Sequence, residues 1–245
     1  MNGWEAIALV LGGGAAGFIN ALAGGGSAIT IPILTEIVGV TTANGTNRIA
    51  ILFANLSAIA GYRKGGVVEW HTVARLVPPV LAGAAAGAWL ATMTAPGIMR
   101  RVFAVVLAGV ALSVLLRPGR WVQERRAVLA EPWRSLVFAG IGFYGGFVQA
   151  GVGFLLLAGL VLGGGLDLVR GNAAKVILIF AYTPIAIVVF AGASQIDFGV
   201  GVVLTAGQVV GAWVGSRLAV ARGAPWVRWV LVAAAGIAVI RLAFF

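Results

Sequence analysis

The chain contains no cysteine and few charged residues. Of its 245 residues, 10% are charged, whereas ordinary soluble domains carry roughly 25%. The absence of cysteine excludes disulfides, thiolate metal sites and cysteine nucleophiles. A single histidine and the lack of clustered acidic residues leave neither a ligand set for a metal ion nor the parts of a hydrolytic centre. We therefore expect no cofactor, no metal site and no enzymatic activity.

Hydrophobic residues make up 61% of the chain and occur in long runs. A transmembrane helix needs about 20 mostly apolar residues, and such runs follow one another here with short polar intervals. A β-barrel would need alternating apolar and polar positions, which runs such as Val102 to Leu116 lack. The sequence therefore predicts an all-helical, polytopic protein that lies in the lipid bilayer.

The net charge of +10 would suggest a nucleic-acid partner in a soluble protein. Here the Arg and Lys residues lie mostly between apolar runs, where they mark loops that stay in the cytoplasm. Residues Met1 to Glu5 lack the basic region of a signal peptide. We expect a multi-pass protein of the bacterial inner (plasma) membrane that binds no nucleic acid.

The apolar segments fall into two sets of five. They lie at about 4–23, 27–39, 47–62, 72–92 and 98–116, and then at about 134–150, 152–164, 173–192, 199–219 and 226–244. AGAAAGAWLA from Ala82 resembles VGAWVGSRLA from Val210, an offset of 128, and Gly45 in NGTNR falls against Gly171 in RGNAAK, an offset of 126. Small residues at such spacing also occur wherever membrane helices pack closely. The steady offset favours a duplication within one domain at 1–245, with a first repeat at 1–116, a cytoplasmic linker at 117–133 and a second repeat at 134–245.

The basic loops favour five crossings in each half. Five crossings from an outside N-terminus place the four basic loops inside and the cation-free loop at 194–197 outside, with Arg100 and Arg101 as the exception. An odd number of crossings inverts the second half, which is the inverted-repeat plan of many secondary transporters. Four crossings would put residues 194–197 on the basic side.

The second segment of each half is too short to span a bilayer. Residues 27–39 and 152–164 make about 20 Å of helix against a hydrocarbon core of about 30 Å. Glycine clusters precede both segments and permit sharp reversals, and Pro32 interrupts the first. Paired, broken or re-entrant segments of this kind indicate the binding site of a transporter. A helix that begins at Ser27 would direct unpaired N–H groups at an anion.

Polar residues near these breaks are the candidate ligands. Arg48 and Lys175 hold near-equivalent places in the two halves, which predicts that they bind an anion together. The alternative is that both side chains simply extend to the membrane interface. The polar residues further into the segments either line the path or only join helices by hydrogen bonds; they are Asn20, Asn55, Ser57, Tyr144, Gln149, Tyr182 and Gln208. The candidate substrate-binding residues are Asn20, Gly24, Gly25, Gly26, Ser27, Thr46, Asn47, Arg48, Gln149, Gly151, Asn172 and Lys175.

Two stretches of the chain resemble a known family. GFINALAGGGSAITIPILTEIVGVTTANGTNRIA, and later GFYGGFVQAGVGFLLL followed by RGN, are similar to the repeated motif of the sulfite exporter TauE/SafE family of membrane permeases. The second copy departs from the pattern, with AGVGF and with Gly159 where a proline is common. The resemblance covers nearly the whole chain and implies transport of sulfur-containing anions such as sulfite or the organosulfonate sulfoacetate.

These observations predict a secondary transporter that moves a small anion by alternating access at a site between two inverted repeats. An anion channel is the nearest alternative, and an intramembrane enzyme is a more distant one. The expected partners are the anionic substrate and the lipid bilayer. The sequence leaves open whether the protein forms a homo-oligomer.

Overall fold

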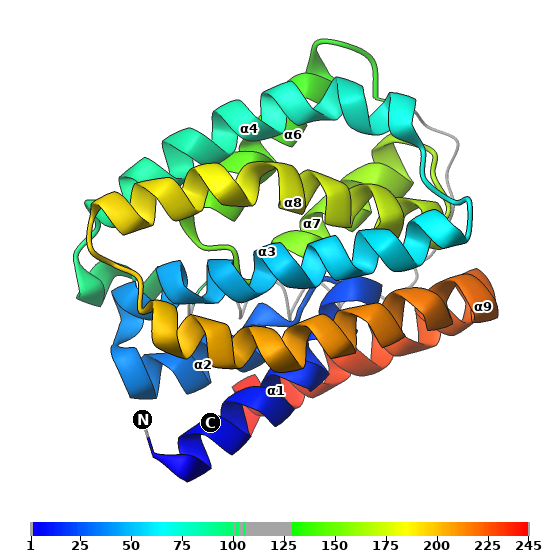
Figure 1. Ribbon diagram of the computed structural model, residues 1–245. Helices are drawn as coiled ribbons and strands as arrows, with labels where there is room; N and C mark the ends of the chain where they lie inside the picture. The colour runs from blue at the N-terminus through cyan, green and yellow to red at the C-terminus, as the bar shows by residue number, and fades with distance from the viewer. Residues whose placement is uncertain (1, 100, 103–104, 106–128, 245) are drawn as a thin grey trace.

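The computed structural model describes residues 2–99, 101–102, 105 and 129–244, and every regular element within these ranges is a helix (Figure 1). The all-helical prediction is confirmed for this part of the chain. The first half contains α1 (Gly3–Leu22), α2 (Ser27–Val38), α3 (Val40–Lys64) and α4 (Trp70–Thr92). The second half contains α6 (Trp133–Phe147), α7 (Val152–Ala158), the π-helix η2 (Gly159–Gly163), α8 (Leu168–Gly192) and α9 (Phe198–Phe244).

Four of the described helices are long and apolar enough to cross a membrane: α1, α4, α8 and the part of α9 from Phe198 to Leu231. The two segments expected to be short are short, since α2 has 12 residues and α7 with η2 covers Val152–Gly163. Most of the expected segment at 98–116, together with linker residues 117–128, lies outside the described residues. The described residues therefore form a set of helices long enough to span a membrane, with one short segment in each half.

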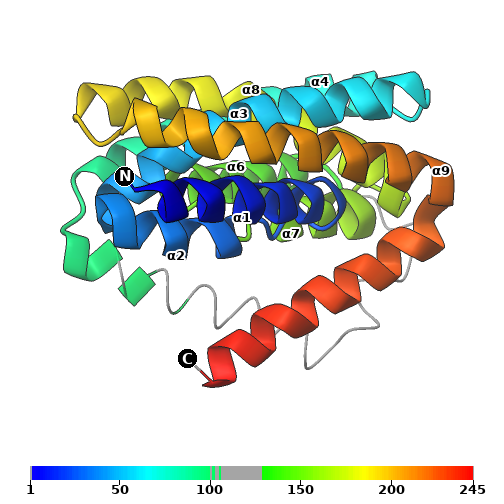
Figure 2. The ribbon, with the colours of Figure 1, turned by 60° about the horizontal axis from the view of Figure 1, so that its bottom comes forward.

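Helices of one half pack mainly against helices of the other. α1 lies along α9, α4 lies along α6, and α3 lies against both α8 and α9. Figure 2 shows α3, α4, α8 and the first part of α9 in one layer, with α1, α2, α6 and α7 beneath it. Neither half would bury its apolar faces without the other.

The repeated small-residue motif serves these contacts between the halves. A Cβ atom added at Gly83 of α4 would lie 2.0 Å from the carbonyl oxygen of Ala139 in α6. A Cβ atom added at Gly211 of α9 would lie 1.9 Å from the carbonyl oxygen of Gly14 in α1. Backbones approach this closely only where glycine removes the side chain. The motif therefore allows close helix packing in both halves.

The long helix α9 bends at Gly223, whose φ of 72° and ψ of −175° are not helical. Pro225 follows and lacks the N–H that a continuous helix would need. This bend separates the two segments expected at 199–219 and 226–244, and Figure 2 shows the C-terminal part of α9 turning back at an angle beneath the first part.

Two helices begin earlier than the apolar pattern predicted. α3 starts at Val40 and α8 at Leu168, whereas the sequence suggested starts near 47 and 173. The Asp167 side chain caps α8 by accepting hydrogen bonds from the N–H groups of Val169 and Arg170. The polar residues expected at the entrances to these segments therefore lie inside helices. The apolar runs alone did not predict this.

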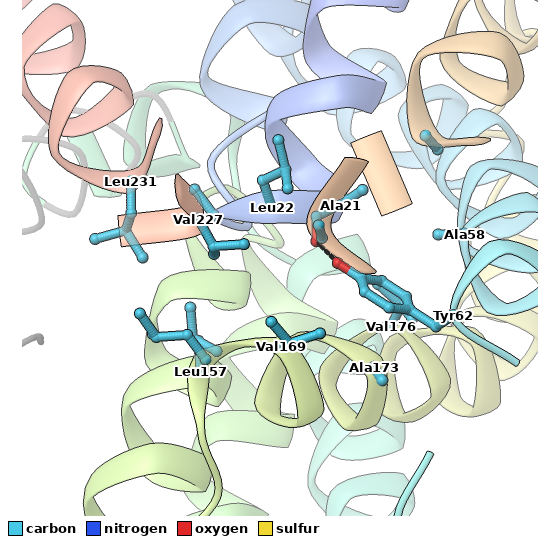
Figure 3. Packing of buried hydrophobic residues seen from close by; sticks show 14 of the residues in the cluster. Ala21, Leu22, Ala58, Tyr62, Leu157, Val169, Ala173, Val176, Val227 and Leu231 are labelled. Atoms are coloured by element: carbon cyan, nitrogen blue, oxygen red, sulfur yellow. Dashed lines mark hydrogen bonds between the residues drawn. The ribbon is translucent and has the colours of Figure 1, made fainter. Parts of the chain in front are cut away.

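The interior is apolar and is built from both halves. Figure 3 shows Leu22 of α1, Tyr62 of α3, Val176 of α8 and Val227 of α9 packed in one cluster. Each of these side chains is nearly or fully buried. The polar groups described below are embedded in this apolar surrounding, where an unpaired polar atom is costly.

Candidate functional site

The two broken segments meet at glycines. A Cβ atom added at Gly24 would lie 2.3 Å from the Cα atom of Gly153, and one added at Gly153 would lie 2.3 Å from the Cα atom of Gly24. Gly24 has a φ of +87°, a left-handed conformation that glycine adopts without strain. The turn between α1 and α2 therefore touches the start of α7 backbone to backbone, at the junction of the two halves.

The end of α1 is capped by side chains of α3 and α8. Lys175 donates hydrogen bonds to the carbonyl oxygens of Asn20 at 2.8 Å and Ala21 at 3.3 Å, and to Oδ1 of Asn172 at 2.5 Å. Asn172 donates to the carbonyl oxygen of Leu22 at 2.7 Å, and the Tyr62 hydroxyl donates to that of Ala21 at 2.9 Å (Figure 3). These bonds satisfy carbonyl groups that a helix end leaves without partners.

The end of α6 is capped in a matching way by α3. Arg48 donates hydrogen bonds to the carbonyl oxygens of Gly145 at 3.2 Å and Gly146 at 2.5 Å, and to Oδ1 of Asn44 at 3.2 Å. Asn44 donates to the carbonyl oxygen of Phe147 at 2.8 Å. Each cation thus lies on a helix end from the other half of the chain, beside an asparagine that shares the capping.

Both cations are completely buried and have no acidic partner in the described ranges. Arg48 and Lys175 are each 0% exposed. The ion pairs within the described residues are Arg134–Glu131, Arg170–Glu69 and Arg170–Asp167, which involve other cations. The guanidinium of Arg48 also lies 4.6 Å from the centre of the Phe190 ring. The alternative that these cations only snorkel to the interface is therefore wrong, because both are held inside the bundle.

Three residues near the end of α6 carry buried polar atoms without a hydrogen-bond partner among the described residues. These atoms are Nε of Arg48, the hydroxyl of Tyr182 and both amide atoms of Gln149. The Tyr182 hydroxyl lies against Gly145, 2.8 Å from the position of an added Cβ atom. Gln149 is 2% exposed and has a φ of +63°, which costs a residue with a Cβ atom about 1 kcal/mol. Buried donors and backbone strain of this kind are typical of functional positions.

A second group of buried polar side chains lies between α2, α3 and α9. Thr30 donates to Oδ1 of Asn47 at 2.8 Å, and Asn47 donates to the Ser27 hydroxyl at 3.2 Å. Nε2 of Gln208 lies 3.4 Å from Oδ1 of Asn47, while Oε1 of Gln208 has no partner in the part of the chain that the structure describes. The second half has the apolar, buried residues Val152 and Leu156 at the positions of α7 that correspond to Ser27 and Thr30, at offsets of 125 and 126.

The start of α2 differs from the expectation. Ala28 donates its backbone N–H to the carbonyl oxygen of Gly25 at 3.0 Å, and Ile29 donates to that of Gly26 at 2.9 Å. The prediction of unpaired N–H groups is wrong for these two residues, because the glycine turn folds back and supplies acceptors. The N–H groups of Ala28 and Ile29 are therefore not open donors for an anion at the start of α2.

The predicted site residues other than Thr46 fall into three places. Asn20, Gly24, Gly25, Gly26, Asn172 and Lys175 gather at the end of α1, and Arg48, Gln149 and Gly151 gather at the end of α6. Ser27 and Asn47 belong to the polar group between α2, α3 and α9. Thr46 lies apart, since its hydroxyl accepts a hydrogen bond from the N–H of Asp197 before α9. The candidate list missed Thr30, although it lies one turn after Ser27 on the same helix.

Comparison with known proteins places the chain in a family. It matches the sulfite exporter TauE/SafE family over residues 9–242. It is 32% identical to the "Probable membrane transporter protein ORF9" of Sinorhizobium sp, over 89% of this chain and 84% of the relative. It is 26% identical to the "Probable membrane transporter protein YfcA" of Escherichia coli (strain K12), over 89% of this chain and 81% of that relative. No solved structure matches at a significant level. The chain therefore belongs to the sulfite exporter TauE/SafE family of membrane transporters.

Proposed function

We propose that the protein is a multi-pass secondary transporter of the bacterial inner membrane that moves sulfite or an organosulfonate such as sulfoacetate. The observation that carries this proposal is Arg48, a fully buried cation at the end of α6 with no acidic partner in the described ranges. A buried charge is costly unless it is paired. A substrate anion would supply the negative charge that the surrounding carbonyl groups provide only in part.

The proposal includes two inverted repeats, at 1–116 and 134–245, joined by a linker at 117–133. Three pairs of residues with positive φ support it: Gly24 and Gln149 (125 apart), Gly39 and Gly165 (126 apart), and Gly66 and Ser194 (128 apart). Two helix pairs support it too, because α1 packs on α9 as α6 packs on α4. Alternating access would then consist of rocking one repeat against the other about the contact between Gly24 and Gly153.

The proposed site comprises the predicted residues at the two helix ends and in the polar group between α2, α3 and α9. Amide and hydroxyl groups would bond the substrate oxygens, and Arg48 would supply charge. Asn47, Arg48, Gln149, Asn172 and Lys175 are each at most 2% exposed. An enclosed site of this kind favours a transporter with a saturable flux over an open anion channel.

A thermal-shift screen tests the proposed function. Purified protein would be heated with sulfite, thiosulfate, sulfate, sulfoacetate or acetate, and a ligand at 100 times its dissociation constant stabilises by about 2.7 kcal/mol. We expect sulfite or sulfoacetate to raise the unfolding temperature and to saturate in liposome flux measurements. Stabilisation by acetate alone would contradict the sulfur-anion assignment, and a flux that rises linearly with concentration would favour a channel.

A further inference from the structure

The two capped helix ends differ in how completely their polar groups are used. At the end of α1, Lys175 makes three hydrogen bonds, which equals the number of protons on its ammonium group. The Tyr62 hydroxyl donates to Ala21 there. At the end of α6, Arg48 retains an unpartnered Nε and the Tyr182 hydroxyl makes no hydrogen bond among the described residues. The α1 end is therefore saturated, whereas the α6 end has free donors.

The two helix ends also differ in the backbone, at Gly24 and Gln149. Gly24 follows the C-cap of α1 with a φ of +87°, and Gln149 follows the C-cap of α6 with a φ of +63°. Glycine is the residue that this left-handed position prefers. Gln149 instead holds a strained backbone and buries an amide that has no partner among the described residues. Compared with glycine, Gln149 adds backbone strain and buries an unpaired amide. A residue with both costs is expected where its side chain is needed for function.

From this asymmetry we infer that the substrate anion binds at the end of α6 through Nε of Arg48, the Tyr182 hydroxyl and the Gln149 amide, and that Lys175 is a structural cap at the end of α1. The inference rests on the proposed function and narrows its site to one of the two helix ends. The second repeat then supplies Tyr182 and Gln149, and the first repeat supplies Arg48.

The chemistry of the three groups fits a sulfur oxyanion. The Arg48 N–H, the Tyr182 O–H and the Gln149 amide N–H groups are all donors, and the oxygens of sulfite or of a sulfonate are acceptors. Hydrogen bonds between a donor and an ionised acceptor are roughly twice as strong as neutral ones. Oε1 of Gln149 is an acceptor as well and would suit a protonated oxygen such as that of hydrogensulfite. Lys175 has no proton left to offer without breaking a cap.

Two tyrosines provide a matched test. Tyr182→Phe removes a hydroxyl that makes no hydrogen bond among the described residues, whereas Tyr62→Phe removes a hydroxyl that caps Ala21. We expect Tyr182→Phe to weaken sulfite or sulfoacetate binding about tenfold and to leave the unfolding temperature unchanged. Tyr62→Phe should lower the unfolding temperature and leave the affinity of the folded protein unchanged. Calorimetric titration and thermal unfolding of purified protein measure both quantities.

Two glycine substitutions test Gln149 with the same assays. Gln149→Gly and Ser194→Gly both replace a residue of positive φ, at 63° and 57°, and both should relieve backbone strain. We expect Gln149→Gly to raise the unfolding temperature by about 2 °C and to weaken anion binding about tenfold. Ser194→Gly lies in the loop before α9 and should leave binding unchanged.

The outcomes distinguish a failure of the proposed binding site from a failure of the proposed transport function. If the wild-type protein binds sulfite or sulfoacetate but Tyr182→Phe and Gln149→Gly bind it equally well, the site at the end of α6 is wrong and the transporter function stands. If Tyr62→Phe weakens binding as much as Tyr182→Phe, the two ends are equivalent and the asymmetric site is wrong. If the wild-type protein binds neither sulfite nor sulfoacetate, the proposed function and the site assignment both fail.

Discussion

Arg48 connects the architecture of the protein to its proposed chemistry. Its terminal nitrogens hold the last carbonyl groups of α6, and its Nε faces no partner within the described ranges. The planar guanidinium presents several N–H groups in a fixed fork, so one side chain can cap a helix and still offer a donor. Lys175 has a flexible stem and three protons, all of which are used for capping. Arg48 can therefore cap a helix and still offer a donor to an anion, whereas Lys175 can only cap.

Substitution of Arg48 tests this double role. Arg48→Gln should weaken anion binding about 10-fold to 100-fold, because a hydrogen bond to a charged group contributes about 1.5 to 3 kcal/mol. Arg48→Lys keeps the charge but loses the fork, so it should retain part of the affinity and lose part of the capping. Calorimetric titration with sulfite or sulfoacetate measures the affinities. Arg63→Gln, at an exposed position on the same helix, is the control and should bind like the wild type. Unchanged affinity in a folded Arg48→Gln protein would place the site elsewhere.

The short broken helices bring the two halves into contact. α2 and α7 begin after turns that contain a left-handed residue, and the turn before α2 meets the start of α7 at Gly24 and Gly153. The π-helix η2 continues α7 in the second half, whereas α2 has Pro32 in the corresponding element. A π-turn accommodates one more residue than an α-turn. This matches the growth of the offset between the halves from 125 at Gly24 and Gln149 to 126 at Gly39 and Gly165.

Gly153→Ala tests whether this contact is needed for folding. The added Cβ atom would lie 2.3 Å from the Cα atom of Gly24, so the turn or α7 must move, at a cost of about 1 to 3 kcal/mol. We expect a lower unfolding temperature and loss of transport in liposomes. Gly140→Ala in α6 is the control, since nothing lies within 4 Å of its added Cβ atom, and it should be neutral or slightly stabilising. Equal effects at the two positions would exclude a special role for the glycine contact.

The arrangement of the whole molecule depends on two antiparallel long helices. Figure 1 shows α3 and α8 running in opposite directions, so that their C-terminal ends lie at opposite ends of the molecule. The two helices also pack against each other. Arg63 and Lys64 lie in the last turn of α3, whereas α8 has no basic residue in its last turn. This charge difference favours a cytoplasmic end for α3 and an outer end for α8.

Cysteine labelling tests this orientation, and the natural absence of cysteine makes each introduced thiol unique. Gly65→Cys should react with a membrane-impermeant maleimide only from the cytoplasmic side, and Ser194→Cys only from outside. Intact cells and inverted vesicles provide the two sides. Labelling of both cysteines from the same side would contradict the inverted arrangement.

The sequence by itself determined the helical class, the membrane setting and the two short segments, because hydropathy and glycine breaks are local properties of the chain. It also pointed to Arg48, Lys175 and Gln149 through their places near those breaks. Only the tertiary structure decided what these residues do, since the carbonyl groups that Arg48 and Lys175 cap lie 97 to 155 positions away along the chain. Which helix end is saturated, and which has free donors beside Gln149, depends on packing between the halves that no local pattern encodes.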